Sequence, residues 1–163
     1  MDNHMDDTYQ YNSVIVAKYI AAKANSMRYN INMTKIQKLL YIAYGIYLAV
    51  KGVRLTNEHP KAWPYGPVFP TTRNKLSKVN LEDLSIDDPS LSELKENPEI
   101  NSMLDLVFST YGKMTATELT AWSHQDNSPW AKAVNDTNFK WGNVIDDQFI
   151  KEYFLNKIER DAQ

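Results

Sequence analysis

The 163-residue chain contains no cysteine, so it can form neither a disulfide bond nor a thiolate metal site. It has only five glycines, and none of them lies in a phosphate loop, a dinucleotide-binding motif or a nucleophile elbow. The longest apolar-rich run, residues 39–50, is well short of the ~20 residues that span a bilayer, and the N-terminus has no signal-peptide pattern. These absences predict a cytoplasmic protein that is neither a membrane protein nor an enzyme.

Metal-ligating and catalytic side chains are equally scarce. The chain has three histidines, His4, His59 and His124, and no two of them have the helical spacing of a zinc site. The acidic pairs 87–88 and 146–147 consist of adjacent residues, whose side chains diverge on a helix or a strand and fit loops and helix caps better than acid–base catalysis. We therefore expect no catalytic residue, no bound metal and no cofactor.

Charge is unevenly divided along the chain. Residues 29–80 contain eight basic residues and one acidic residue, whereas residues 81–163 contain seven basic and sixteen acidic residues. If the two parts face different ways, the basic part forms an electropositive side that attracts an acidic protein or a nucleic acid. The alternative is that these charges lie on solvated helix faces that attract each other within the fold.

Hydrophobic periodicity predicts a mainly α fold: a single compact domain of about six or seven helices with a small irregular or β element near residues 55–69. We expect a flexible N-terminal tail over residues 1–12 and the domain over 13–163. Residues 80–97 hold six acidic residues and no sustained apolar face, which predicts an acidic loop. Helices are expected over residues 13–24, 34–51, 70–76, 98–111 and 115–125. Two more are expected to begin at residues 128 and 146.

The segment 34–51 is predicted to be the most buried helix. Thr34 and Gln37 have the spacing of a capping box, six apolar positions follow on one face, and Gly52 supplies a left-handed stop. Gly45 inside this helix costs about 1 kcal/mol relative to alanine, which predicts a compensating packing contact, such as the close approach of another backbone.

Rigid aromatic and proline residues gather outside the periodic runs. The segment 62–68 has the sequence Ala-Trp-Pro-Tyr-Gly-Pro-Val, and Ser123-His124-Gln125 and Ser128-Pro129-Trp130 follow later in the chain. Such residues lose little entropy when they are fixed, so they suit a stiff corner over the core or a surface presented to a partner. In the segment 62–68, one of the rings of Trp63 and Tyr65 can be buried while the other is exposed to a partner. On the predicted helix 34–51, Lys35, Lys38 and Tyr41 share one side, as a binding strip or a solvated flank.

These motifs carry a family resemblance. In order, the chain has Lys38-Leu39-Leu40-Tyr41, then Ala-Trp-Pro-Tyr-Gly-Pro-Val over 62–68, then Tyr-Gly over 111–112, then Ser123-His124 and Pro129-Trp130. Over residues 12–155 this arrangement resembles the Panacea domain of SocA-like antitoxins and phage-associated proteins. Pro64, Phe69 and the pair 71–72 depart from the family pattern, which bears on the identity of the partner rather than on the fold.

The resemblance implies an antitoxin that neutralises, by direct protein binding, a cognate toxin encoded beside it. Some relatives act as proteolytic adaptors, so a protease or a chaperone is a further possible partner. By resemblance, His124 matches the family histidine, which we expect to tie two segments together. The predicted partner-binding residues are Lys35, Lys38, Tyr41, Trp63, Tyr65, Gly66, Pro67, His124 and Trp130.

A nucleic-acid-binding regulatory module is the alternative. The basic part, residues 29–80, interleaves cations with aromatic residues as an electrostatic footprint for phosphates does. Salt distinguishes the two functions, because phosphate binding weakens steeply with salt and an apolar hot spot does not.

Overall fold

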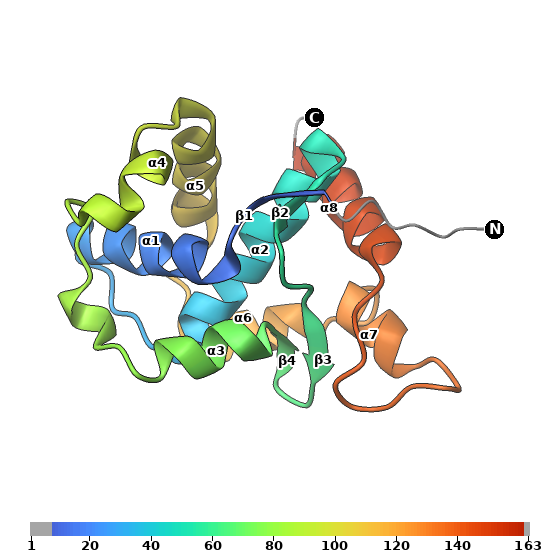
Figure 1. Cartoon of the computed structure of the whole chain (residues 1–163). Helices are drawn as coiled ribbons and strands as arrows, with labels where there is room; N and C mark the ends of the chain where they lie inside the picture. Colours follow the sequence, from blue (N-terminus) through green and yellow to red (C-terminus); the bar gives the residue numbers. More distant parts are fainter. Residues whose placement is uncertain (1–7, 162–163) are drawn as a thin grey trace.

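The computed structural model describes residues 8–161. Within this range the chain forms eight α-helices, two short 3-10 helices and two pairs of short strands (Figure 1), which confirms the mainly α fold. The elements, in chain order, are β1 Tyr9–Tyr11, α1 Ser13–Ser26, α2 Met33–Lys51, β2 Arg54–Thr56, β3 Lys61–Trp63, β4 Gly66–Val68, α3 Pro70–Leu76, η1 Leu81–Asp83, η2 Pro89–Leu91, α4 Ser92–Lys95, α5 Pro98–Tyr111, α6 Ala116–Ser123, α7 Pro129–Val134 and α8 Asp147–Asp161.

Helix α2 is the centre of the core, as predicted. It packs against α1, α5, α6 and α8 and against β2 and β4, and fourteen of its residues are buried. Its N-cap is Asn32, whose side chain accepts the Lys35 N–H, so the predicted Thr34 capping box is wrong. The Gln37 side chain accepts the backbone N–H of Phe69 at 2.7 Å instead of returning to the helix start. The left-handed stop at Gly52, with φ of 74°, is confirmed.

Gly45 allows α8 to lie close against α2. A side-chain carbon at this position would overlap the ring of Phe154, which is 1% exposed. The predicted packing contact is therefore confirmed, and α8 makes it with a side-chain ring rather than with its backbone. Burial of the Phe154 ring in this contact offsets the helix-propensity cost of the glycine.

The strands tie the two ends of α2 to the rest of the chain. Strand β1 pairs in parallel with β2 and buries Tyr11, so the predicted flexible tail is wrong for residues 9–11. Residues 1–7 lie outside the described part. The predicted β element near residues 55–69 is confirmed as β2 and the antiparallel β3–β4 hairpin. An isolated β-bridge between Lys61 and Val144, with backbone hydrogen bonds to Pro60 and Ala62, joins the loop before α8 to the hairpin.

Residues 80–97 are more ordered than the acidic loop we expected. They form η1, η2 and α4, and Leu91 and Leu94 are buried beneath them. Leu81, Leu84 and Ile86 also pack against the core, and the Asn25 side chain of α1 donates to the carbonyls of Leu81 and Leu84. These contacts with a distant helix fix the segment, and its own sequence has no helical period that would predict them.

The later helices begin where the sequence places them. Asn97 caps α5, Thr115 and Glu118 form the predicted capping box of α6, and Ser128 caps α7. Helix α6 ends at Ser123, two residues before the predicted end. None of the helices in residues 8–161 is long and apolar enough to cross a membrane.

Candidate protein-binding surface

The β3–β4 hairpin turns tightly at Pro64 and Tyr65. Trp63 pairs with Gly66 across the turn, and Gly66 has a φ of 109°, a conformation in which other residues are strained. A side-chain carbon on Gly66 would lie 2.6 Å from the Ser123 hydroxyl. Glycine is therefore needed both for the turn and for the approach of α6.

Two aromatic ring nitrogens hold the carbonyl groups of this turn. The Trp130 indole N–H donates to the carbonyl of Trp63 at 2.8 Å, and His124 Nε2 lies 3.1 Å from the carbonyl of Pro64. The two rings also meet edge to face, with centroids 4.0 Å apart. His124 thus ties the end of α6 to the hairpin, as expected. Because a carbonyl can only accept, Nε2 carries the proton of this hydrogen bond. Burial lowers the pKa of His124, although the Pro64 carbonyl opposes this shift.

The anchored turn presents one ring and covers the other. Tyr65 is 74% exposed at the tip, whereas Trp63 is half-buried and its ring lies under the Arg73 guanidinium at 5.8 Å. The structure thus exposes Tyr65 and half-buries Trp63, and contact of either ring with a partner stays a prediction. Between the hairpin and the first turns of α2 lies a pocket of about 270 Å³, lined by residues that include Gln37, Lys38 and Tyr65.

The predicted binding residues on α2 are enclosed by the fold. Lys35, Lys38 and Tyr41 are 6%, 3% and 1% exposed, so they form no solvated flank, although Lys35 and Lys38 each line a pocket. The Lys38 ammonium donates to the carbonyl of Pro67 at 3.2 Å, and burial lowers its pKa to about 8. The physical reason is that neighbours surround α2 on every side, so lysine stems can be buried there while their ammonium groups bind backbone carbonyls. Tyr41 packs against Trp122 and Phe154.

Pro67 and Gly66 support the hairpin from within. Both are buried, and the outward carbonyl of Pro67 accepts the Lys38 hydrogen bond. Proline has no N–H to leave unpaired at the edge of the hairpin. We define the hairpin surface as Trp63, Tyr65, His124, Trp130 and Trp141.

Trp141 is the member of this surface that the sequence reading missed. Its ring is 55% exposed and lies 6.3 Å from the ring of Trp130. Phe139 packs perpendicular to it at 5.0 Å, and Gly142 turns the chain with a φ of 93°. A sequence pattern could have predicted this position of Trp141. A glycine follows two large aromatic residues outside a helix in Phe139-Lys140-Trp141-Gly142, as it does in the hairpin segment.

The sequence reading also missed a partly buried polar cluster at the start of α8. The Tyr44 hydroxyl donates to Asp147 at 2.5 Å, His59 Nδ1 lies 3.7 Å from the same carboxylate, and His59 Nε2 lies 2.7 Å from an Arg54 nitrogen. Burial raises the pKa of Asp147, while Tyr44 and His59 oppose the shift. These residues join α2, β2 and α8, and no local pattern brings them together.

The structure reduces the basic face that motivated the nucleic-acid alternative. Of the eight basic residues in 29–80, Lys35, Lys38 and Arg54 are buried, and Lys51 pairs with Glu99 at 2.5 Å. Arg73, Lys75 and Lys78 are exposed on or beside α3. In residues 8–161, no three histidine or acidic side chains are placed to hold a metal ion together.

Together, the fold and the hairpin surface define a small helical domain that presents aromatic side chains from a fixed turn. A family model described as "Antitoxin SocA-like, Panacea domain" matches residues 36–131, a range that includes the hairpin, His124 and Trp130. The chain belongs to this family. It is 33% identical over 150 residues to Antitoxin SocA of Caulobacter vibrioides (strain NA1000 / CB15N), covering 85% of this chain and 80% of that protein. No solved structure matches the chain.

Proposed function

We propose that this protein is an antitoxin that neutralises its cognate toxin by direct contact through the hairpin surface. Membership of the SocA-like antitoxin family supports the antitoxin role. The exposure of Tyr65 supports this position of the contact site. Tyr65 is 74% exposed on a turn whose two carbonyls each bind an aromatic ring nitrogen.

A fixed turn favours binding because its ordering cost is met when the protein folds. Association otherwise loses free energy to the immobilisation of loops and side chains. Tyrosine and tryptophan are enriched among the few residues that dominate interface energy, and they have few rotatable bonds to immobilise. Tyr65 and Trp141 supply such rings, while His124 and Trp130 hold the turn beneath them.

The pocket beside the hairpin extends this surface toward α2. Its wall combines the Tyr65 and Trp63 rings with the stem of Lys38 and the Arg73 guanidinium. An apolar side chain of the toxin that enters it displaces water from apolar carbon, and a nearby acidic side chain pairs with Arg73.

Copurification tests direct binding. The protein encoded beside this chain is coexpressed with it, and the complex is followed by size-exclusion chromatography at about 50 mM and about 500 mM salt. We expect a complex at both concentrations, because apolar hot spots tolerate salt. The absence of a complex at either concentration contradicts direct neutralisation. Binding to duplex DNA that disappears at the higher salt concentration supports the nucleic-acid alternative.

Toxin abundance in the same cells separates blocking from delivery to a protease. If the chain only blocks the toxin, the bound toxin accumulates with it. If the chain is an adaptor, the toxin disappears when the chain is present and returns when the protease is removed. We propose blocking, because contact between the hairpin surface and the toxin needs no third protein.

A further inference from the structure

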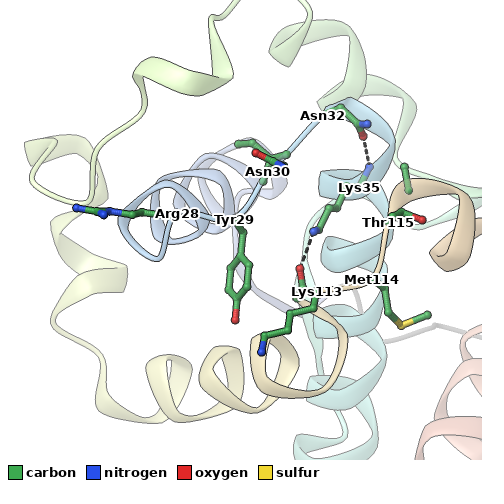
Figure 2. Close-up of a pocket in the computed structure, with 11 residues that line it drawn as sticks. Arg28, Tyr29, Asn30, Asn32, Lys35, Lys113, Met114 and Thr115 are labelled. Atoms are coloured by element: carbon green, nitrogen blue, oxygen red, sulfur yellow. Dashed lines mark hydrogen bonds between the residues drawn. The ribbon is translucent and has the colours of Figure 1, made fainter.

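A second pocket lies between the loop that precedes α2 and the turn that precedes α6 (Figure 2). It has a volume of about 420 Å³, and eleven residues from segments 28–35 and 112–116 line it. Tyr29 forms one wall, and its ring stacks on Phe108 with an interplanar angle of 2°. The wall is therefore a fixed surface, anchored in the core by α5.

Lys35 is an unusual residue for the floor of this pocket. It is 6% exposed, its ammonium donates to the carbonyl of Gly112 at 2.5 Å, and it lies 5.7 Å from the centre of the Tyr29 ring. An ammonium group has three N–H donors. Within residues 8–161, one neutral carbonyl is its hydrogen-bond acceptor, and no carboxylate pairs with it. A buried cation without a counter-charge is costly for the fold.

A second cation lies at the same pocket. Lys113 lines it and is exposed. Figure 2 shows the Lys113 ammonium near the hydroxyl end of Tyr29 and the Arg28 guanidinium on the far side of Tyr29, pointing away from Lys35. The eleven lining residues include no aspartate or glutamate. Each nearby helix start has one backbone N–H bound by its own cap, since Asn32 accepts from Lys35 N and Thr115 accepts from Glu118 N. The two lysines bring full positive charges to the pocket.

We propose that this pocket binds an oxyanion, a carboxylate or a phosphate group, between Lys35 and Lys113. The anion supplies the counter-charge that Lys35 lacks and accepts its remaining N–H donors as charge-assisted hydrogen bonds. Lys113 is exposed, so its flexible stem can bring the ammonium to the solvent side of the ligand, and the Tyr29 ring forms the wall beside it. This site is distinct from the hairpin surface, so it goes beyond the proposed function and can fail without affecting it.

Backbone amide shifts in NMR spectra of the full chain test the site. The chain is titrated separately with inorganic phosphate and with N-acetyl-glutamate amide at constant ionic strength. We expect saturable shifts confined to residues 28–35 and 112–116, with a dissociation constant on the order of 1 mM. Stronger binding of phosphate indicates a phosphate group as the natural ligand, and stronger binding of the glutamate derivative indicates an acidic side chain. The absence of saturable shifts at these residues with either probe overturns the proposal.

Three variants make the test specific. Lys113→Gln removes an exposed charge and should weaken binding about tenfold without changing the melting temperature. Lys35→Met should abolish binding, and Lys113→Gln keeps the test decisive if Lys35→Met does not fold. Lys78→Gln removes an exposed lysine beyond α3 and should leave binding unchanged. Equal weakening by Lys78→Gln, or unchanged binding by Lys113→Gln, shows a general charge effect and contradicts a defined site.

Discussion

The tip of the β3–β4 hairpin and the flank of α2 carry the same kinds of residue and have opposite fates. Tyr65 at the tip is 74% exposed, whereas Tyr41 on α2 is 1% exposed. The polar groups of the two regions have different roles in hydrogen bonding. Carbonyls of the hairpin tip accept from His124 and Trp130, whereas the α2 lysines donate to carbonyls of neighbouring segments.

This difference shows that residue type does not decide which aromatic and basic residues meet a partner. Pro64 and Gly66 allow the chain to turn outside the packed helices, and ring N–H groups then fix the turn with its tip in solvent. On α2, neighbours on all sides leave no solvent-facing flank. The comparison predicts binding effects at the tip and stability effects on α2.

The largest effect is expected for Tyr41→Ala. Removing this ring leaves a cavity between Trp122 and Phe154 and should lower the free energy of unfolding by about 3–5 kcal/mol. Urea denaturation measures the loss, and Tyr65→Ala is the matched control, with an expected change within about 0.5 kcal/mol. Similar losses in the two variants would remove the contrast between the regions.

A smaller effect is expected for Trp130→Phe. The substitution keeps a ring against His124 but removes the N–H that donates to the carbonyl of Trp63. Loss of this bond should destabilise the fold by about 1–2 kcal/mol and speed amide exchange at Gly66. Trp141→Phe is the control, because no hydrogen bond of its indole is recorded in residues 8–161, and unchanged exchange at Gly66 in Trp130→Phe would contradict the anchoring role.

The smallest effect concerns pH and Lys38. Burial lowers the pKa of folded Lys38 from 10.5 to about 8, so the unfolded chain binds more protons than the folded chain between these values. Stability therefore rises with pH in this window, by about 1 kcal/mol between about pH 7 and pH 9. Above about pH 10 the trend reverses, because burial raises the pKa of Tyr41 and Tyr44 above that of the unfolded chain.

Chemical denaturation at a series of pH values measures this rise. Lys38→Met should remove most of it, leaving the smaller contribution of Lys35, whose pKa burial also lowers. Lys75→Met, at an exposed position in α3, should keep it. A rise of the same size in Lys38→Met would show that Lys38 is not the group that titrates.

Local rules predicted the helices well, since caps such as Thr115 with Glu118 and stops such as Gly52 act within one turn. They failed where the outcome depends on distant segments. Gln37 had the spacing of a capping residue, yet its side chain binds Phe69, and β1 forms only because β2 lies beside it. The aromatic motif at 62–68 pointed to the hairpin, whereas the burial of Lys35 and Lys38 depends on contacts 77 and 29 residues away.

The affinity of the cognate toxin for Tyr65→Ala tests the central claim most directly. Isothermal titration calorimetry compares it with the unsubstituted chain and with Tyr9→Ala, which removes another exposed tyrosine, in β1 beyond the C-terminal end of α2. We predict that Tyr65→Ala loses about 2 kcal/mol of binding free energy, about thirtyfold in affinity, with an unchanged melting temperature, and that Tyr9→Ala loses none. Unchanged affinity in Tyr65→Ala, or equal losses in both variants, would contradict the assignment of the hairpin surface as the toxin-binding site.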